Sequence, residues 1–216
     1  MTKKEKYQQV IRWFQENKPV AASELHYDNP YELLVAVILS AQCTDKRVNM
    51  TTPAFFRAFP EPETLATSNA ETVYEYIKSI SYPNNKAKHL VEMARMLVAD
   101  FKGKVPNNIE DLMKLPGVGR KTANVVASVA FNIPAMPVDT HVFRVSNRIG
   151  LTNQSKTPLE TEKELVRFIP RHLLAIAHHW LILHGRYVCT AHKPNCAACE
   201  IKNYCDEYLQ LNKIKK

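Results

Sequence analysis

Apolar residues in this chain recur mainly at helical spacing, three and four residues apart, and the alternation typical of β-strands is hard to find. The pattern begins near the N-terminus, where an apolar stripe is formed by Tyr7, Val10, Ile11 and Phe14. This stripe predicts an amphipathic first helix and not a secretory signal, because no uninterrupted apolar run follows the basic residues.

A second apolar segment, Leu33–Leu39, predicts a helix that is buried on nearly all sides. Asn29, Pro30 and Glu32 precede it and suit an N-cap, a first helical residue and a capping-box acid. The apolar run of seven residues is the longest in the chain, yet spanning a bilayer takes roughly 20. We therefore expect a soluble, cytoplasmic protein.

The same spacing predicts further helices at Ala70–Ile80, Lys86–Phe101, Asn108–Leu115, Lys121–Ala130, His141–Ile149, Leu159–Ile169 and Arg171–His184. Glycine is scarce, with five residues, and the 13 prolines fall mostly between these segments. Short helices separated by turns have this appearance. The pattern therefore predicts an all-α protein, and since no linker separates the segments, any two lobes must share a tight interface.

Charge adds a class of partner to this picture. Lysine and arginine number 29 against 21 for aspartate and glutamate, which gives a formal net charge of +8. Such an excess favours polyanions, nucleic acid among them. The length of 216 residues suits one large domain or two small ones with a substantial core.

Four of the five cysteines crowd into the last 28 residues as C-x6-C-x2-C-x5-C, at Cys189, Cys196, Cys199 and Cys205. Four thiolates can complete one metal centre, either zinc or an iron–sulfur cubane. Zinc ribbons more often use two C-x2-C pairs, so the single pair here favours iron–sulfur. A disulfide is the alternative, which a cytosolic chain makes less favourable. Cys43 stands alone and is expected to be a buried small hydrophobe.

A glycine-containing turn lies between two predicted helices, in the segment LPGVGRKTA at Leu115–Ala123. Gly117 and Gly119 allow positive φ and the close approach of another backbone. Successive amides at the following helix start can then hold a phosphate oxygen without reading bases. An ordinary turn between two helices is the alternative.

Lys121 directly follows this turn. The positive end of the helix and the neighbouring Arg120 both disfavour an ammonium ion, which predicts a lowered pKa and an amine able to form a Schiff base. A phosphate contact is the alternative role. Eighteen residues later, Asp139 precedes another predicted helix start. It is either an N-cap or, if it faces Lys121, a group that steers water, stabilises a cationic sugar or shuttles protons.

Two stretches that contain these residues, LPGVGRKTANVV and VDTHVFRVSNR, resemble the endonuclease III family of helix-hairpin-helix DNA glycosylases. LSAQCTDKRVN at residues 39–49 and HHWLILHGRYVC at residues 178–189 extend the likeness from the first helix to the last cysteine. The resemblance implies a two-lobed all-α fold. A central six-helix barrel spans 23–134, and the second lobe comprises 1–22 plus 135–216 with a cluster loop at 189–205. DNA is expected across the cleft between the lobes.

The resemblance also implies a bifunctional DNA N-glycosylase and abasic-site lyase of base excision repair. Lys121 would attack C1′ of an oxidised pyrimidine nucleotide flipped out of double-stranded DNA, Asp139 would assist, and β-elimination would cut the strand 3′ to the lesion. One structural [4Fe-4S] cluster is expected on the four cysteines. The enzyme is expected to be a monomer associated with the bacterial nucleoid.

Two alternatives to this function stay open. One is a catalytically silent helix-hairpin-helix module that binds DNA, and the other is a monofunctional glycosylase that hydrolyses the glycosidic bond with water. The mismatch adenine glycosylases, which this sequence also resembles, lack a lysine at the hairpin position of Lys121. Lys121 therefore favours lyase activity, and the joint presence of Lys121 and Asp139 favours an enzyme over the silent module.

Contacts with DNA follow from the same resemblance, and each has a structural alternative. Gln42 would fill the void left by the flipped base, or else be a buried amide that caps a helix end. Tyr82 stands where the family has a wedging leucine, although Pro83 stiffens that loop. Asp45 would lie near the damaged nucleotide, or cap the segment that begins at Lys46.

The remaining expected contacts involve the backbone of DNA. Gly117, Val118, Gly119 and Arg120 would hold phosphate at the hairpin. Lys193 would present a cation from the cysteine loop, or else be a solvated surface lysine. His141 would contact DNA or satisfy a helix start. The adjacent His178 and His179 are expected to pack and hydrogen-bond, because the cysteines already make a four-ligand set.

Overall fold

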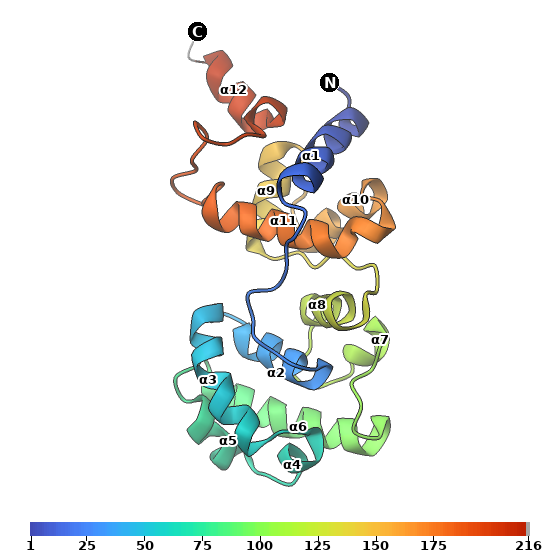
Figure 1. Ribbon diagram of the computed structural model, residues 1–216, viewed down its shortest axis with the longest axis vertical. Coiled ribbons are helices and arrows are strands. Elements are labelled where there is room, and N and C mark those ends of the chain that lie inside the picture. The colour runs from blue at the N-terminus through green and yellow to red at the C-terminus, as the bar shows by residue number, and fades with distance from the viewer. Residues whose placement is uncertain (215–216) are drawn as a thin grey trace. The chain divides into compact units, whose positions relative to one another are not determined.

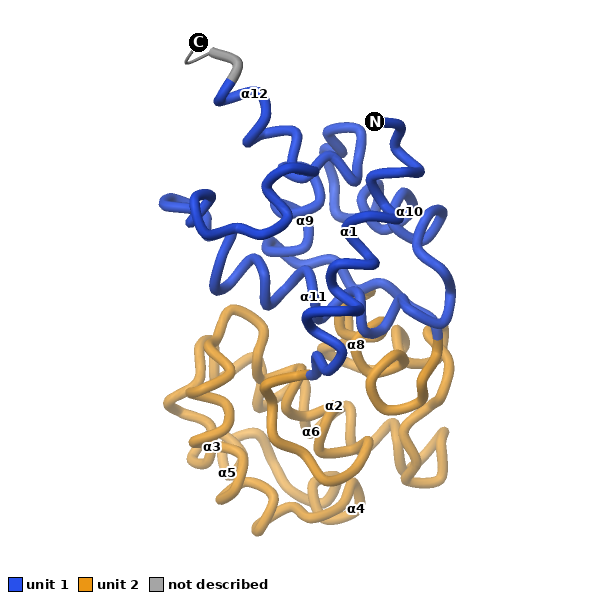
Figure 2. Tube along the Cα trace, turned by 45° about the horizontal axis from the view of Figure 1, so that its top comes forward, with its two compact units in different colours: residues 1–22, 134–216 blue, residues 23–133 orange. Residues whose placement is uncertain are grey.

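The computed structural model describes residues 1–214, and every regular element in that range is a helix. The all-α class predicted from the sequence is confirmed. The chain forms two compact units, coloured separately in Figure 2. Unit 1 combines residues 1–22 with the chain from Pro134 onward, and unit 2 is the continuous stretch Ser23–Ile133. Each unit has its own hydrophobic core.

Unit 2 is organised around the apolar helix α2. Its helices are α2 (Pro30–Ser40), α3 (Asp45–Ala58), α4 (Pro62–Ala66), α5 (Ala70–Ile77), α6 (Pro83–Phe101), α7 (Ile109–Leu112) and α8 (Arg120–Phe131) (Figure 1). Helix α2 packs against α3, α6 and α8. The whole run Leu33–Leu39 is buried, as its uninterrupted apolar sequence predicted.

Unit 1 brings the N-terminal helix together with the C-terminal part of the chain. Its elements are α1 (Lys3–Asn17), α9 (Thr140–Ile149), α10 (Pro158–Phe168), the 3-10 turn η1 (Arg171–Leu173), α11 (Leu174–Tyr187), the 3-10 turn η2 (Lys202–Tyr204) and α12 (Asp206–Ile214). Helix α9 contacts α10, α11 and α12. The predicted stripe of α1 is buried at Tyr7, Val10 and Phe14. Phe14 stacks on Trp180 of α11, with ring centroids 5.5 Å apart.

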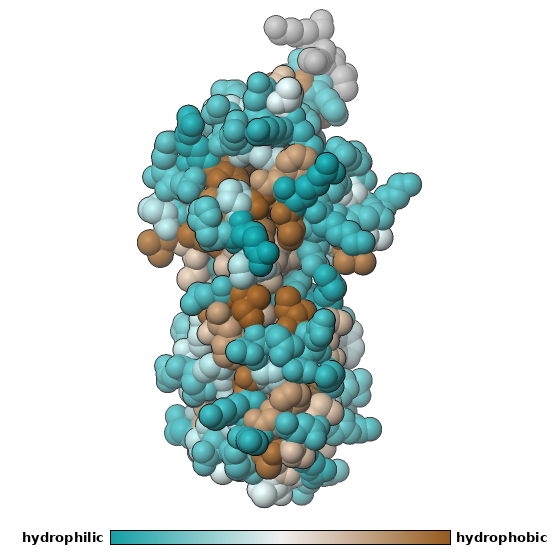
Figure 3. Space-filling model, turned by 90° about the vertical axis from the view of Figure 1, so that its right-hand side faces the viewer, coloured by the Kyte–Doolittle hydropathy of each residue, from teal (hydrophilic) through white to brown (hydrophobic). Residues whose placement is uncertain are grey.

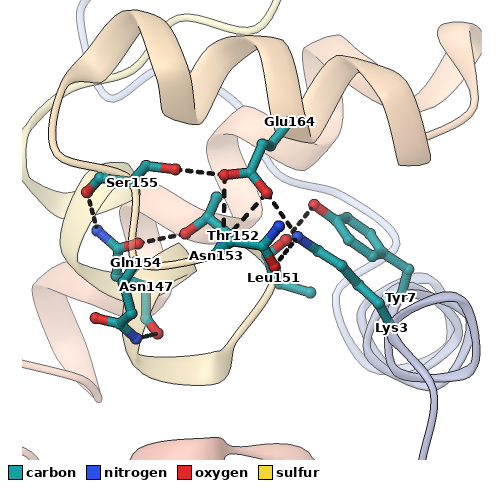
Figure 4. Close-up of polar contacts among 9 residues, drawn as sticks. All are labelled: Lys3, Tyr7, Asn147, Leu151, Thr152, Asn153, Gln154, Ser155 and Glu164. Carbon is teal, nitrogen blue, oxygen red and sulfur yellow. Dashed lines mark hydrogen bonds and ion pairs between the residues drawn. The ribbon is translucent and has the colours of Figure 1, made fainter.

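A polar network centred on Glu164 joins three parts of unit 1 (Figure 4). Its carboxylate accepts hydrogen bonds from Lys3 Nζ at 2.6 Å and from Ser155 Oγ at 2.7 Å. The backbone amide of Asn153 also donates to it, at 3.1 Å. One carboxylate therefore ties α1 and the loop that follows α9 to α10.

The start of α2 is as predicted in one respect and different in another. Asn29 is the N-cap, with its Oδ1 atom accepting from the Glu32 amide at 3.0 Å, and Pro30 is the first helical residue. Glu32 does not complete a capping box with Asn29, because its carboxylate accepts from the amide of Asp28 at 2.8 Å instead. The backbone amides of Asp28 and Asn29 are both within reach of the Glu32 side chain. The sequence pattern does not show which of the two amides will donate to it.

Several helix boundaries differ from the predicted ones by a few residues. Helix α5 ends at Ile77 and not at residue 80. Helix α6 begins at Pro83, three residues before the predicted start, because proline suits the first helical position. The segment predicted as one helix from Arg171 to His184 divides into η1 and α11. The predicted packing role of His178 is confirmed, since its Nδ1 atom lies 2.9 Å from Pro137 O in the core of unit 1.

In residues 1–214, no helix combines the length and the apolar character needed to cross a bilayer. Hydrophilic residues cover most of the face shown in Figure 3, and apolar residues reach it only in small groups.

Candidate active site and cysteine loop

The turn between α7 and α8 contains two glycines in different situations. Gly117 has a positive φ of 79°, and a Cβ added there would lie 3.0 Å from His89 Cβ, so this position requires glycine for its conformation. Gly119 has an extended backbone with φ of −87°, and no described atom lies within 4 Å of a Cβ added there. Of these two glycines, only Gly117 uses the positive φ that glycine allows, and no contact among the described residues requires a glycine at position 119.

Helix α8 begins without a capping side chain at Gly119. The amide of Ala123 donates to Gly119 O at 2.9 Å, while the amides of Lys121 and Thr122 precede the first internal hydrogen bond. Val118 faces inward, because its side chain is only 7% exposed and its amide donates to Leu115 O at 3.1 Å. The start of α8 therefore presents backbone donors and a positive helix end to solvent.

Lys121 lies on the first turn of α8 and is exposed. The opposite face of this helix is buried at Ala123, Val126 and Ala127 and packs against α2. The rigid core of unit 2 therefore fixes the backbone from which the lysine projects. Its neighbour Arg120 is also exposed, so two cations stand side by side at the positive end of one helix.

Asp139 belongs to unit 1, where it is the N-cap of α9. Its Oδ1 atom accepts from the Val142 amide at 2.8 Å, which is the more modest of the two roles predicted for it. The residues before it, from Ala135 to Val138, are buried. The carboxylate is half-buried, and its second oxygen has no hydrogen bond to any described residue. The cap therefore fixes the carboxylate through Oδ1 alone.

Two other predicted DNA contacts occupy strained and exposed positions of unit 2. Gln42 and Tyr82 both have left-handed backbone conformations, with φ of 55° and 56°. Gln42 is exposed, so the alternative of a buried capping amide is wrong. Tyr82 is 62% exposed and directly precedes Pro83, the first residue of α6. Residues other than glycine adopt this conformation rarely, and mostly where function or packing imposes it.

The remaining predicted contacts are distributed between the units. Asp45 is the first residue of α3, and Thr44 is the N-cap, so the suggestion that Asp45 caps this helix is wrong. His141 is half-buried, with Nδ1 3.2 Å from Arg144 Nη2. Lys193 is exposed in the cysteine loop. Its carbonyl accepts from Thr190 Oγ1 at 2.7 Å, which closes a tight turn there.

The four clustered cysteines line one pocket of unit 1, with about 330 Å³ of empty space that includes open solvent. Its other walls come from α9, α11, α12 and the loop, at Ile149, His184, Val188, Pro194, Asn195, Ile201, Lys202 and Tyr208. No carboxylate lines it among the described residues. All four thiols are half-buried and none forms a disulfide, which excludes the disulfide alternative in this structure.

Two arginines of α9 hold the start of the cysteine loop. Arg148 places Nη1 3.6 Å from Cys189 Sγ and 2.8 Å from Thr190 O. Arg144 donates through Nη2 to Cys189 O at 3.1 Å and to Gly185 O at 2.8 Å. Sequence reasoning missed both arginines, because their partners are mainly backbone carbonyls.

The four cysteines are the donor set that a metal centre could use in this pocket. Within residues 1–214, no three His, Cys, Asp or Glu side chains are arranged to hold one metal ion. Burial raises the pKa of the Cys199 thiol and raises that of Cys205 to about 11. Burial thus favours the neutral form of both thiols, and a bound cation would favour their thiolates. Four sulfur atoms around an apolar pocket suit an iron–sulfur group.

The family model of the HhH-GPD superfamily of base excision DNA repair proteins matches residues 35–171, which are more than half of the chain. The chain belongs to this superfamily. It is 50% identical to endonuclease III of Rickettsia conorii, over 94% of this chain and 96% of that protein. It is 48% identical to endonuclease III of Bacillus subtilis, over 88% and 86% of the two chains.

The superfamily fold is confirmed by a solved structure of a trapped endonuclease III–DNA covalent intermediate. That chain matches this one with a TM-score of 0.92 and 42% identity, covering 98% of this chain and 100% of the other. Membership and fold make this chain an enzyme of base excision repair, in the DNA glycosylase and abasic-site lyase class. The resemblance inferred from the hairpin and the cysteine spacing is thus confirmed at the level of the family.

Proposed function

We propose that this superfamily member removes oxidised pyrimidines from double-stranded DNA and then cleaves the resulting abasic site 3′ by β-elimination. The observation that carries the proposal is the start of α8, where an exposed lysine follows directly on a turn with available backbone donors. Its relatives at 48–50% identity bear the name endonuclease III, which supports the same activity.

Lys121 is proposed as the nucleophile. Its amine nitrogen would attack C1′ of the flipped nucleotide while the bond from C1′ to the base breaks, and the base would leave with the electron pair and take up a proton. The nitrogen then loses a proton, the C1′–O4′ bond breaks and O4′ takes up a proton, which gives a Schiff base between Nζ and the opened sugar. Removal of a C2′ proton then expels the 3′ phosphate. The exposure of this amine at the start of α8 supports the proposed role.

Asp139 is proposed to assist with the carboxylate oxygen that the N-cap leaves unused. A carboxylate stabilises positive charge on the sugar as the base departs and accepts the proton released by the attacking amine. The monofunctional and silent alternatives do not require this pair. The presence of both an exposed lysine and an immobilised carboxylate favours the lyase.

DNA is proposed to approach the hairpin through its phosphate backbone. At Gly119 a side chain would meet open space, so the glycine leaves room for a ligand outside the protein. Arg120, Lys193 and His141 would add contacts to phosphate or sugar, and Asp45 would lie near the damaged nucleotide. Gln42 and Tyr82 would probe the duplex from their exposed turns. Val118 would contribute packing, because both its side chain and its amide face inward.

Cys189, Cys196, Cys199 and Cys205 are proposed to hold one [4Fe-4S] cluster. The fit rests on four half-buried thiols around one pocket that no described carboxylate lines. The bound group would cross-link the loop and stabilise unit 1. Iron and acid-labile sulfide in near-equal amounts in the purified protein would support this assignment, whereas zinc at one ion per chain without sulfide would refute it.

The activity is tested by borohydride trapping on a duplex that carries one thymine glycol. The intact enzyme should form a covalent band, and Lys121→Ala should lose the band because no amine remains to form the imine. Lys114→Ala is the matched control, since Lys114 is an exposed lysine on the same hairpin. Release of the base without a band would show hydrolysis by water. Neither base release nor a band would leave only a DNA-binding module.

The role of Asp139 is tested by separating its charge from its cap. Asp139→Asn retains a good N-cap, so the free energy of unfolding should stay nearly unchanged while trapping becomes much slower. Asp139→Ala should lose about 1 kcal/mol of stability as well. Full activity in Asp139→Asn would show that the residue is only a cap.

A further inference from the structure

Lys86 is a buried lysine for which the proposed chemistry has no use. It lies in the first turns of α6 and is only 6% exposed. Its Nζ atom donates to Leu39 O at 2.8 Å and to Ala41 O at 2.6 Å. These carbonyls belong to the C-terminal end of α2, where the helix dipole favours a cation. Lys86 therefore fastens the start of one helix to the end of another.

This cation has no acidic partner among the described residues. Its Nζ atom donates to backbone carbonyls alone among the described residues, and burial lowers the pKa of Lys86, with the nearby Cys43 acting in the opposite direction. Burying a charge without a counter-ion is unfavourable unless several dipoles compensate it. A methionine in this place would avoid that penalty, so stability alone does not explain the lysine.

The two ends that Lys86 joins carry Gln42 and Tyr82. Gln42 directly follows Ala41, whose carbonyl accepts from Nζ. Tyr82 O accepts from the backbone amide of Lys86 at 3.2 Å. One residue thus bonds through its side chain to the turn before Gln42 and through its main chain to Tyr82. Both of these residues are exposed and have left-handed backbones.

A second connection between the same two turns runs through α3. Thr51 Oγ1 lies 3.2 Å from Ser79 Oγ, and Arg47 donates to Ser79 O at 3.5 Å. Ser79 lies three residues before Tyr82, and α3 starts three residues after Gln42. The turns therefore remain connected when the Lys86 side chain is removed. Such a variant should fold and lose mainly the fine placement of the two side chains.

We propose that Lys86 is a positioning residue that holds Gln42 and Tyr82 in one fixed arrangement, so that both side chains enter the duplex together when the damaged base leaves it. This inference rests on the proposed function. Extrusion of a base requires something to occupy the space that it leaves. Two inserted side chains can do so together only if the distance between them matches the spacing in the duplex. Displacement of a positioning group by about 1 Å can lower a rate about a hundredfold.

The expected effect differs between two substrates. A paired thymine glycol must be extruded from the stack, which requires both probes. An abasic site in a single strand has no base to extrude, yet it still reacts with the amine of Lys121. Lys86→Met retains the aliphatic stem but donates no hydrogen bond. It should excise the paired lesion at least tenfold more slowly and trap on the single-stranded abasic site within about threefold of the intact enzyme.

The experiment compares single-turnover rates on both substrates and follows extrusion with 2-aminopurine placed opposite the lesion. Lys88→Met is the matched control, because Lys88 is exposed on the same helix. Lys86→Arg should recover part of the excision rate, since a guanidinium also donates to carbonyls. Thermal unfolding of each variant, with Lys86→Gln as a second replacement, shows whether the fold is retained.

A double-mutant comparison decides how Lys86 acts. If it works through the two probes, then adding Lys86→Met to the Gln42→Ala, Tyr82→Ala enzyme should slow excision by less than twofold. A full additional loss in that background, or an equal loss on both substrates, would overturn the inference. If the intact enzyme neither excises nor traps on either substrate, the proposed function itself is wrong. If only the Lys86 variants differ from expectation, the inference about Lys86 is wrong and the proposed function is unaffected.

Discussion

Both units bury one lysine at the C-terminal end of a helix, but the two lysines have different partners. Lys6 in unit 1 is 5% exposed, and its Nζ donates to Ile149 O at the end of α9 at 3.1 Å. It also forms an ion pair with Asp206. Lys86 in unit 2 reaches two carbonyls at the end of α2 and has no carboxylate partner among the described residues.

The difference in partners indicates that the two buried lysines have different roles. Asp206 directly follows Cys205, the last cysteine of the loop, so the Lys6 pair anchors the end of that loop to α1 and α9. In unit 2 an added carboxylate would stabilise Lys86 but would place negative charge next to the exposed Gln42. Negative charge repels phosphate. We infer that unit 1 uses its lysine for stability and unit 2 uses its lysine for placement.

The largest expected effect follows from removing the two lysines in parallel. Lys6→Met leaves Asp206 without its cation and should lower the free energy of unfolding by about 2–3 kcal/mol, less than for a fully buried pair because Asp206 is 46% exposed at its side chain. Lys86→Met should change it by less than about 1 kcal/mol in either direction, since a desolvated charge is removed together with its hydrogen bonds.

Urea unfolding of both variants measures this order, with Lys4→Met as the control. Lys4 is exposed on the same helix as Lys6, and its replacement should change stability by less than about 0.5 kcal/mol. Greater destabilisation in Lys86→Met than in Lys6→Met would contradict the division between a stabilising and a positioning lysine.

An intermediate effect should separate the two glycines of the hairpin. Gly117→Ser places a side chain at positive φ and close to His89, which should destabilise unit 2 by about 1–2 kcal/mol. Gly119→Ser introduces a good N-cap in open space, so stability should be unchanged or slightly higher. Its affinity for duplex DNA should nevertheless fall severalfold. Binding by Gly119→Ser at the level of the intact protein would show that DNA does not approach this position.

The smallest effect concerns Glu164 and acid. Burial, the largest single influence, raises the pKa of this carboxyl, but hydrogen bonds from Lys3, Ser155 and Asn153 together hold the pKa below its ordinary value of 4.5. Because the folded pKa is depressed, the stabilisation is fully present above pH 4.5 and disappears as pH falls through the folded value. Glu164→Gln should therefore lower stability by about 1 kcal/mol at neutral pH.

Melting temperatures of the intact protein and Glu164→Gln between about pH 3 and 7 test this directly. The difference between the two proteins should narrow as the solution becomes acidic, since protonated glutamate and glutamine carry the same charge. Lys78 and Glu75 form an exposed pair in unit 2, so Glu75→Gln is a suitable control with almost no effect at any pH. A difference that stays constant with pH would show that charge on Glu164 is unimportant.

Much of this architecture is predictable from the sequence, because helical periodicity and the clustering of cysteines depend only on the spacing of residues along the chain. The apolar run of α2, the turn before Lys121 and the cysteine spacing were all recognised in this way. Lys86 was not recognised, because its partners are backbone carbonyls, which every residue possesses. Gln42 illustrates the same limit, since a polar residue beside an apolar helix is compatible with burial or exposure until its backbone conformation is known.

The order of the chain within the two units has a consequence for how the protein is made. Unit 2 is continuous and is complete once Ile133 has left the ribosome, whereas α1 emerges first and belongs with elements that are synthesised last. During translation the buried stripe of α1 at first lacks its partners, because Tyr7 stacks on Phe168 of α10 and Phe14 stacks on Trp180 of α11. Domains generally fold as units as they are synthesised. The newborn chain therefore exposes the apolar stripe of α1 for most of its synthesis, and unit 1 can fold only after unit 2 has been made.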